Sequence, residues 1–227
     1  MKLTKKEKTL ARSITEKMSA LRITKFPMGT LSFPLLWKII SKEEDAFAKK
    51  LLKINPKRYG FKGKFLGISP VPRHLVTIRN QEYFIGNVRW LIWPVLLPRS
   101  VYTAYKKLNA ALRKETGLSL LIQSGYRSPA YQLVLFFKWL EIHSWNFKRT
   151  ATRAALPGWS EHGYPKKQAI DFMTKSGLGS SDKGNFEKTK EYAWLLKNAK
   201  RFGFMLSYPR GNKDGVIFEP WHWSHRR

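Results

Sequence analysis

The sequence predicts a protein of the α+β class, in which helices and strands are mixed without the regular alternation of a doubly wound sheet. The chain has 227 residues, of which 43% are hydrophobic and 14% aromatic, enough for a sizeable core. Segments with apolar residues at helical spacing alternate irregularly with short apolar runs typical of strands. The pattern becomes regular only after Ser100. We therefore expect an N-terminal extension over residues 1–98 and a main domain over residues 99–227.

The extension is expected to be partly helical and partly irregular. Residues 1–25 predict a basic amphipathic helix, which either packs on the domain or lies on a membrane surface or a partner. Its apolar face is formed by Leu10, Ile14, Met18 and Leu21. The remaining segments are an aromatic, proline-broken stretch over 26–40, a short helix over 42–54, and a Gly- and Pro-rich stretch over 55–98 with strand-like "HLVTI" and "EYFIG".

The main domain predicts three helices and three strands. The first helix has Ser100 as its N-cap and Gly117 as its stop, and the second begins with the favourable pair Ser128 and Pro129. The third helix ends at Gly203. In chain order we expect a helix over 100–115, a strand over 118–124, a helix over 128–143, a strand over 168–173, a helix over 186–203 and a strand over 216–223.

The charge is strongly basic, with 43 Lys and Arg against 15 Asp and Glu, or +28. Such an excess favours a polyanionic partner: nucleic acid, anionic lipid or an acidic cell wall. No nucleic-acid-binding motif accompanies the charge, so nucleic acid is not expected. There is no cysteine, which excludes disulfides and thiolate metal sites. Any metal site must use histidine and carboxylate ligands.

No segment reads as a targeting signal. "MKLTKKEKTLARSITEKMSAL" lacks the apolar centre of a signal peptide, and "WLIWPVLLP" is too short to span a bilayer. We expect a soluble protein that can sit on anionic surfaces.

One metal site can be assembled from "SEHGYPKKQAIDF" and "EPWHW". Two imidazoles and one carboxylate, from His162, Asp171 and His222, are a donor set typical of catalytic zinc. Glu219 is placed to act as the base that accepts a proton from water. If the last segment is extended, Glu219 and His222 start on opposite faces, so a bend or bulge near Pro220 is required. Each pair alone is also typical of ordinary polar residues in turns.

A positive charge is needed wherever an oxyanion develops. Arg127, in "SGYRSPAYQ", is a candidate for this role or for holding a substrate carboxylate. Gln132 follows in the first turns of the next helix and is expected to face the same cleft. The other three histidines, His74, His143 and His225, are interpreted as structural or surface residues.

Together, "SGYRSPAYQ", "SEHGYPKKQAIDF", "FEKTKEYAWLLKNAKRFGFMLSYPRG" and "IFEPWHW" resemble the zinc D-alanyl-D-alanine carboxypeptidase family, which includes the VanY and DacB-like enzymes and related phage endolysin peptidases. The resemblance covers about residues 100–223. It implies a small, central, mostly antiparallel sheet flanked by helices, a fold shared by D,D-peptidases and Hedgehog-like domains.

The resemblance also implies a site with one Zn²⁺ per chain. Its metal ligands would be His162, Asp171 and His222, with Glu219 as catalytic base. Arg127 would be a catalytic and substrate-binding residue. Further substrate contacts would come from Gln132, Ser160, Tyr208 and Trp221.

The sequence departs from the family pattern in two places. The family usually has seven residues from the His to the Asp, with a Gly four residues before the Asp. Here the separation is nine and Lys167 occupies the Gly position, which predicts a two-residue insertion around Pro165. Loop insertions of this size cost little stability. After "EPWHW" the chain continues as "SHRR", where the family tends to have Arg and a short apolar tail.

The resemblance implies a zinc peptidase that hydrolyses peptidoglycan stem peptides next to D-amino acids. A D-Ala-D-Ala or L,D-carboxypeptidase is expected, with a peptidoglycan endopeptidase or endolysin as the alternative. A second alternative is a non-catalytic basic module that binds anionic envelope polymer or nucleic acid. We expect a monomer that acts at the cell envelope, after lysis or unconventional export, with anionic polymers or a membrane surface as further partners.

Overall fold

The computed structural model describes residues 1–24, 26–180 and 183–226. The chain divides into two compact units, and each is described by itself. Unit 1 comprises Met1–Val71, Arg127–Gly163 and Gly211–Ile217, and unit 2 comprises Pro72–Tyr126, Tyr164–Arg210 and Phe218–Arg227. In the described part of the chain, no helix is both long enough and apolar enough to cross a bilayer.

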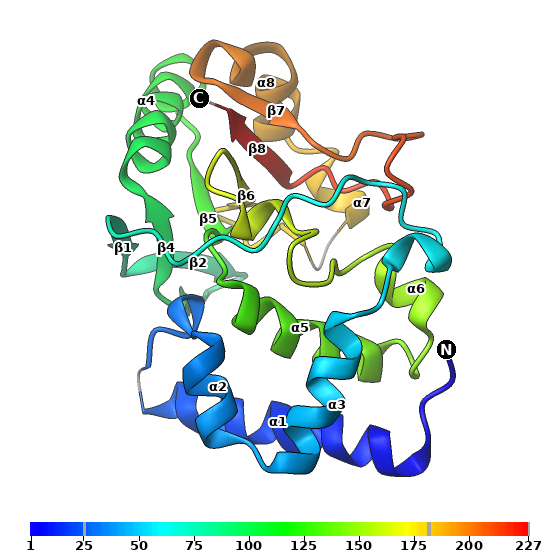
Figure 1. The fold of residues 1–227 in the computed structure, drawn as a ribbon. Helices are drawn as coiled ribbons and strands as arrows, with labels where there is room; N and C mark the ends of the chain where they lie inside the picture. Colours follow the sequence, from blue (N-terminus) through cyan, green and yellow to red (C-terminus); the bar gives the residue numbers. More distant parts are fainter. Residues whose placement is uncertain (25, 181–182, 227) are drawn as a thin grey trace. The chain divides into compact units, whose positions relative to one another are not determined.

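Unit 1 is helical and is built around α5, which runs through its core (Figure 1). Phe136 and Phe137 of α5 are fully buried, and the Phe137 ring stacks on Phe47 with 5.6 Å between centroids. Helices α1 and α2 contact α5, and α3 contacts α1. The helices are α1 (Lys5–Ile23), α2 (Phe33–Ile39), α3 (Lys42–Leu52), α5 (Pro129–Ile142) and α6 (Phe147–Ala151), with 3₁₀ turns η1 (Met28–Thr30), η2 (Pro56–Tyr59) and η3 (Glu161–Gly163).

The N-terminal helices begin at side-chain caps that their sequences supply. Thr4 and Glu7 form a capping box at α1, and Ser41 and Glu44 form another at α3. The basic helix expected over residues 1–25 is confirmed as α1. The proline-broken stretch over 26–40 contains α2, which was not expected. Ser32 caps it and Pro34 occupies its first turn, so this proline starts a helix rather than interrupting one.

Residues of the N-terminal extension hold the beginning of α5. The Ser128 amide donates to the Gly29 carbonyl at 2.8 Å, and the Ser128 hydroxyl donates to the Leu31 carbonyl at 2.6 Å. The same hydroxyl accepts the Tyr131 amide as the N-cap of α5. The extension thus fixes the residue that follows Arg127. The domain boundary near Pro98 stays a prediction.

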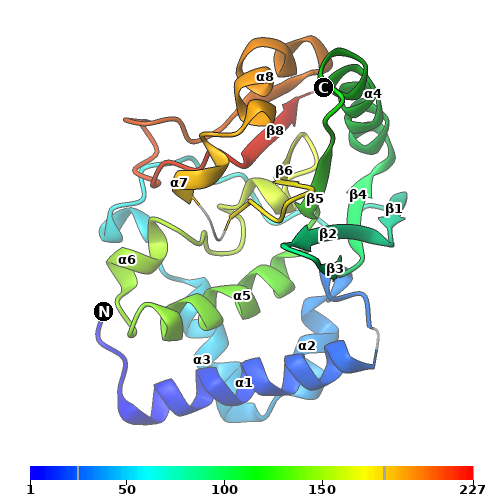
Figure 2. The ribbon, with the colours of Figure 1, turned by 180° about the vertical axis from the view of Figure 1, so that it is seen from behind.

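Unit 2 contains a four-stranded antiparallel sheet in the order β5-β6-β8-β7, which confirms the α+β class and the small antiparallel sheet. Two antiparallel pairs, β1 with β4 and β2 with β3, accompany it (Figure 2). The strands are β1 (Leu75–Ile78), β2 (Gln81–Ile85), β3 (Val88–Ile92), β4 (Val95–Pro98), β5 (Leu120–Ser124), β6 (Lys167–Thr174), β7 (Phe204–Leu206) and β8 (His222–Arg226). The helices are α4 (Arg99–Thr116), α7 (Lys183–Phe186) and α8 (Lys190–Asn198), with the 3₁₀ turn η4 (Ala199–Phe202).

One face of this sheet forms the core of unit 2 with α4 and α8. Ile170 and Phe172 of β6 and Trp223 of β8 are buried there with apolar residues of both helices. Successive side chains of a strand point to opposite faces. The other face of β6 and β8 therefore carries Asp171 and His222.

Helix α4 is fastened to β5 by hydrogen bonds as well as by apolar contact. The Tyr105 hydroxyl donates to the Leu120 carbonyl at 2.8 Å, and the side-chain oxygen Oδ1 of Asn109 accepts the Leu120 amide at 2.8 Å. Gly117 ends the helix with φ 74°, as expected. The prediction of Ser100 as N-cap was wrong, because α4 begins at Arg99 and Ser100 lies inside its first turn.

Two other element boundaries differ from the expected ones. The last strand begins at His222 rather than at residue 216, because the preceding residues form a turn. The helix expected from residue 186 begins at Lys190, where Thr189 caps it, and it tightens into η4 before ending at Gly203 as expected. Strand β7, which follows directly, was not expected.

Candidate active site

Asp171 and His222 form the centre of the candidate site in unit 2. They are directly opposite each other in the register of β6 and β8, so their side chains leave the sheet on the same face. The His222 Nδ1 atom lies 2.9 Å from Asp171 Oδ1. Both residues are buried, at 4% and 6% exposure. A buried imidazole and carboxylate at this distance can share a proton or ligate one cation together.

The segment Glu219–His222 forms a closed β-turn. The His222 amide donates to the Glu219 carbonyl at 3.1 Å, and Pro220 occupies the second position of the turn, where its fixed φ is favourable. The turn brings the Glu219 Oε2 atom to 3.8 Å from His222 Nδ1. This is the bend that the sequence required.

Tyr208 and Trp223 hold this turn from two sides. The Tyr208 carbonyl accepts the Glu219 amide at 3.1 Å, and the Tyr208 ring packs against the His222 ring with 4.8 Å between centroids. The Trp223 indole donates to the Pro220 carbonyl at 2.8 Å, in a buried position. The sequence reasoning missed this role of Trp223. Its signal is the three-residue spacing from Pro220, which spans a turn.

Unit 1 carries Arg127, Ser160 and His162, and two backbone bonds connect them. The Arg127 amide donates to the His162 carbonyl at 3.0 Å. The Ser160 hydroxyl accepts the His162 amide at 3.3 Å, within the 3₁₀ turn η3. Ser160 and His162 are buried, at 9% and 3% exposure. The segments "SGYRS" and "SEHGY", 35 residues apart from Arg127 to His162, therefore lie side by side in this unit.

Gln132 and Trp221 are more enclosed than substrate contacts usually are. Gln132 is 3% exposed, and its amide nitrogen donates to the Ala155 carbonyl at 2.8 Å. Trp221 is 4% exposed and belongs to the core of unit 2. Their roles in substrate binding stay predictions, as do those of Ser160 and Tyr208.

The long connection between His162 and Asp171 closes into a turn around Pro165. The Lys167 amide donates to the Tyr164 carbonyl at 3.0 Å, which encloses Pro165 and Lys166, and β6 starts at Lys167 itself. Lys167 therefore needs no left-handed backbone where the family has Gly.

The glycine of "SGYRS" is required by a close approach of two backbones. A Cβ on Gly125 would lie 2.4 Å from the Leu96 carbonyl oxygen, which accepts the Tyr126 amide at 2.7 Å. Burial raises the pKa of Tyr126 to about 12, so its hydroxyl stays neutral at any physiological pH.

Three buried side chains carry donor atoms suited to a metal: His162, Asp171 and His222. The donors are imidazole nitrogen and carboxylate oxygen, which zinc prefers when thiolates are absent. Two ligands of a tetrahedral zinc, each about 2.0 Å from the ion, lie about 3.3 Å apart. The 2.9 Å between His222 Nδ1 and Asp171 Oδ1 is close to that spacing. The residues of unit 2 therefore fit a zinc ion.

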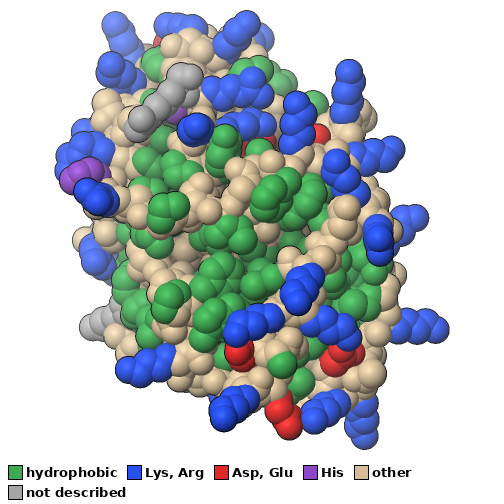
Figure 3. Space-filling model, in the orientation of Figure 1, with side chains coloured by type: hydrophobic (Ala, Val, Ile, Leu, Met, Phe, Trp, Pro, Cys, Tyr) green, Lys and Arg blue, Asp and Glu red, His purple; other side chains and the backbone are tan. Residues whose placement is uncertain are grey.

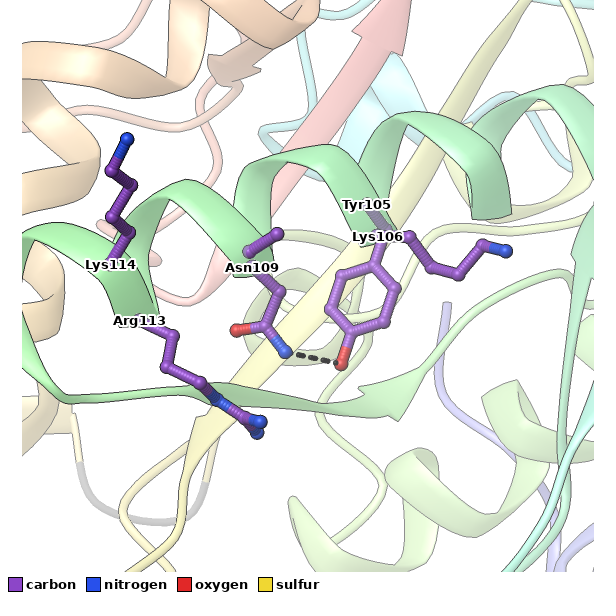
Figure 4. A pocket seen from close by; sticks show the side chains of 6 residues that line it. Tyr105, Lys106, Asn109, Arg113 and Lys114 are labelled. Atoms are coloured by element: carbon purple, nitrogen blue, oxygen red, sulfur yellow. Dashed lines mark hydrogen bonds between the residues drawn. The ribbon is translucent and has the colours of Figure 1, made fainter.

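The surface around these units is basic. Lys and Arg side chains project over the visible face, where Asp and Glu are few (Figure 3). A hollow along α4 is also basic, and no residue predicted for the active site lines it (Figure 4). Its lining residues are Tyr105, Lys106, Asn109, Ala110, Arg113 and Lys114.

The chain is similar to known carboxypeptidases. The family model VanY, described as D-alanyl-D-alanine carboxypeptidase, matches residues 95–226. A D-alanyl-D-alanine carboxypeptidase of Enterococcus faecium is 26% identical over 187 residues, which is 79% of this chain and 52% of that protein. YodJ of Bacillus subtilis is 34% identical over 122 residues, which is 52% of this chain and 42% of that protein. The chain thus spans about half the length of these curated relatives.

A solved structure is similar as well. The LD-carboxypeptidase LdcB superposes with a TM-score of 0.55 at 26% identity, covering 75% of this chain and 78% of that one. The family match includes Arg127 and Glu219 and all three candidate metal ligands. By this match the chain belongs to the VanY family of D-alanyl-D-alanine carboxypeptidases.

Proposed function

We propose that this protein is a zinc-dependent carboxypeptidase that removes a terminal D-alanine from peptidoglycan stem peptides. The observation that carries the proposal is the closed turn Glu219–His222, which holds a carboxylate 3.8 Å from an imidazole that also contacts Asp171. Membership of the VanY family supports the substrate class. The basic surface suits a wall that carries anionic polymers.

His162, Asp171 and His222 would hold one zinc ion per chain. The family motif and the donor chemistry of these three buried residues support this ligand set. When bound, zinc supplies Lewis acidity, which makes water a better nucleophile near neutral pH and polarises a carbonyl.

Glu219 would act as the general base and then as the general acid. Its carboxylate takes a proton from the attacking water and passes it to the leaving amine of D-alanine. The Glu219 backbone makes two hydrogen bonds, one with Tyr208 and one with His222. These bonds hold the residue in place before the substrate reacts, which lowers the entropy cost of positioning its carboxylate. The side chain is 12% exposed, which limits competing proton exchange with bulk water.

Arg127 would bind the negative charge of the substrate. Its guanidinium suits either the terminal carboxylate in a bidentate contact or the oxyanion that develops at the scissile carbonyl. A terminal carboxylate is the feature that distinguishes a carboxypeptidase substrate from an internal bond. Gln132, Ser160, Tyr208 and Trp221 complete the proposed substrate contacts.

The test combines metal analysis with mass spectrometry of a muropeptide digest. The wild-type protein is expected to contain one zinc per chain and to convert pentapeptide stems to tetrapeptides. Glu219→Ala is expected to keep zinc and lose turnover by about 10²- to 10⁴-fold, the usual range for a general base.

Other products would change the assignment. Conversion of tetrapeptide to tripeptide would mean an L,D-carboxypeptidase, the activity named for LdcB. Release of internal fragments would mean an endopeptidase. A zinc-free protein without cleavage would overturn the proposal and favour a basic binding module at the envelope.

A further inference from the structure

The β2–β3 hairpin of unit 2 exposes an unusual number of apolar side chains. All eight residues from Phe84 to Leu91 are exposed. Among the described residues, six of the thirteen large exposed hydrophobic side chains fall between residues 84 and 93. They are Phe84, Ile85, Val88, Trp90, Leu91 and Trp93, with exposed fractions of 43% to 59%. Scattered apolar residues are normal on a surface, but a contiguous group marks an interaction site.

The apolar side chains lie on both faces of the hairpin. Side chains that are opposite each other in an antiparallel pair share a face. The pair Ile85 and Val88 therefore shares one face with the pair Tyr83 and Trp90, while Leu91 lies on the other face. An antiparallel strand pair that packs on its own domain commonly has one apolar face and one polar face. The second face carries Phe84 and Leu91 beside the ion pair of Arg89 and Glu82. A hairpin that exposes apolar side chains on both faces and charges on one is suited to the interface of a membrane.

The base of the hairpin is fixed to unit 2, so its exposure does not come from loose attachment. The Gln81 side chain exchanges two buried hydrogen bonds with the backbone of Ile122, at 2.9 and 2.8 Å. The Phe84 amide donates to the Lys175 carbonyl at 2.9 Å. The turn at the tip is a tight two-residue connection, with Gly86 at φ 57°.

The charges around the hairpin are positive. From Arg79 to Trp93 the sequence has two arginines and a single acidic residue, Glu82, and the Lys175 ammonium donates to the Glu82 carbonyl at 3.3 Å. Arg89 pairs with Glu82 at 3.4 Å, and Arg79 and Lys175 near the base are exposed. Exposed tryptophan, aliphatic side chains and flanking cations together are typical of proteins that insert a short element into the interface of an anionic membrane.

We propose that the β2–β3 hairpin docks this protein on a membrane surface that contains anionic lipid. The tip residues Ile85 and Val88 enter the boundary between headgroups and acyl chains, and Trp90 and Leu91, nearer the base, lie at the headgroup level. The surrounding arginines contact lipid phosphates. This docking is independent of the proposed zinc chemistry.

Two other occupants fit the hairpin less well. A second copy of the chain would bring together two molecules with a formal charge of +28 each, which repel one another. A glycan strand presents hydroxyl groups that need hydrogen-bonding side chains, and between residues 84 and 93 these are Asn87 and Arg89 beside the aromatic rings. The exposed surface is mainly aliphatic and aromatic, which favours lipid.

The absence of cysteine allows a direct test with a single introduced label. An environment-sensitive fluorophore is attached to Val88→Cys and, as a control, to Leu196→Cys on α8. Both positions are 56% exposed and belong to unit 2. Vesicles of phosphatidylcholine with phosphatidylglycerol are expected to shift the emission of the Val88 label to the blue and to leave the Leu196 label unchanged.

A second measurement uses unlabelled protein in vesicle sedimentation. Ile85→Ser combined with Val88→Ser is expected to weaken vesicle binding roughly tenfold or more, because the two aliphatic side chains that enter the acyl boundary are lost. The matched control, Leu196→Ser with Met205→Ser, removes two exposed apolar side chains of the same unit and is expected to bind as wild type.

Several outcomes would overturn the proposal. These are equal shifts of both labels, equal binding of the two double variants, or a Val88 shift caused by glycan strands or by raised protein concentration without vesicles. All four substituted positions are exposed, so each variant is expected to fold. Circular dichroism of each variant checks this.

Discussion

In unit 2 the candidate residues Asp171, Glu219 and His222 lie on two paired strands and a closed turn. In unit 1, by contrast, Arg127 and Ser160 lie in loops and His162 lies in the short 3₁₀ turn η3. Strand register is fixed by a whole ladder of hydrogen bonds and by the burial of alternate side chains. The unit 1 segments are instead joined by individual bonds, among them those from the Arg127 amide to the His162 carbonyl and from the His162 amide to the Ser160 hydroxyl. A change in the core of unit 1 should therefore disturb its functional residues more readily than an equal change in unit 2.

The largest expected effect is on zinc binding, and it compares the proposed ligand in unit 1, His162, with a proposed ligand in unit 2, His222. His162→Ala and His222→Ala are each expected to weaken zinc binding by more than about 100-fold, since loss of a direct ligand exceeds the usual cost of losing a supporting contact. Zinc content after dialysis and competition with a chromophoric chelator measure this. His74→Ala, outside the motifs, is the control. A His162→Ala protein that binds zinc as tightly as wild type would restrict the ligand set to unit 2.

The next effect compares the two cores. Phe137→Ala should cost about 3–5 kcal/mol, because it leaves a cavity between α5 and α3. Hydrogen exchange is expected to quicken in residues 129–142 and to stay slow in residues 167–174. The matched variant Phe172→Ala removes a fully buried ring of unit 2 and should give the reverse pattern. Equal changes in both segments would mean that the units open together.

A smaller effect concerns the turn that holds Glu219. Trp223→Phe leaves the Pro220 carbonyl without its indole donor, which should cost about 1–3 kcal/mol. We expect kcat to fall while zinc content is retained. Trp194→Phe is the control, because the Trp194 indole also donates a hydrogen bond, to the Glu115 carboxylate at 2.7 Å, in a partly buried position on α8. If both variants lose stability but neither loses turnover, Trp223 has only a structural role.

The smallest effect is a pH dependence confined to unit 1. Burial opposes ionisation of Glu44, but hydrogen bonds from Lys17, Ser13 and the Ser41 amide outweigh it and hold its pKa below the usual value. Because the folded pKa is lowered, the ionised pair stabilises the protein above pH 4.5, and this contribution is lost as pH falls through the lowered pKa. We expect a loss on the order of 1 kcal/mol, measured by urea unfolding between pH 6 and 3. Glu44→Gln should flatten this dependence.

The sequence predicted the elements whose periodicity and caps are local. The basic N-terminal helix, the stop at Gly117 and the stop at Gly203 follow from such signals. The sequence did not predict α2, because Pro34 was interpreted as a break although it lies in a first turn. It also placed the last strand from residue 216, because the apolar run there continues through a turn that only the Glu219–His222 hydrogen bond reveals.

The residue types of the candidate site could be predicted from the sequence, but the hydrogen bonds that hold these residues in place could not. Histidine and carboxylate types at the motif positions indicated zinc and a base. The Ser128 bonds to Gly29 and Leu31 join segments far apart in the sequence, which no spacing encodes. The Trp223 bond to Pro220 is local, and its only signal is a three-residue spacing that many unrelated pairs share. The exposure of the β2–β3 hairpin could not be predicted from the sequence either. Its apolar residues resemble core residues until their burial is known.

The order of strands has a consequence for how the protein is made. Strand β8, which carries His222, lies between β6 and β7, and both of these strands precede it in the chain. Until β8 has been synthesised, β6 and β7 each have one edge whose backbone groups lack their hydrogen-bonding partners. The sheet is complete only when β8 pairs with both. A product interrupted before residue 222 would lack a proposed ligand and would expose both edges, which favours aggregation. The pairing of β8 therefore completes the sheet and supplies the last proposed metal ligand in the same folding step.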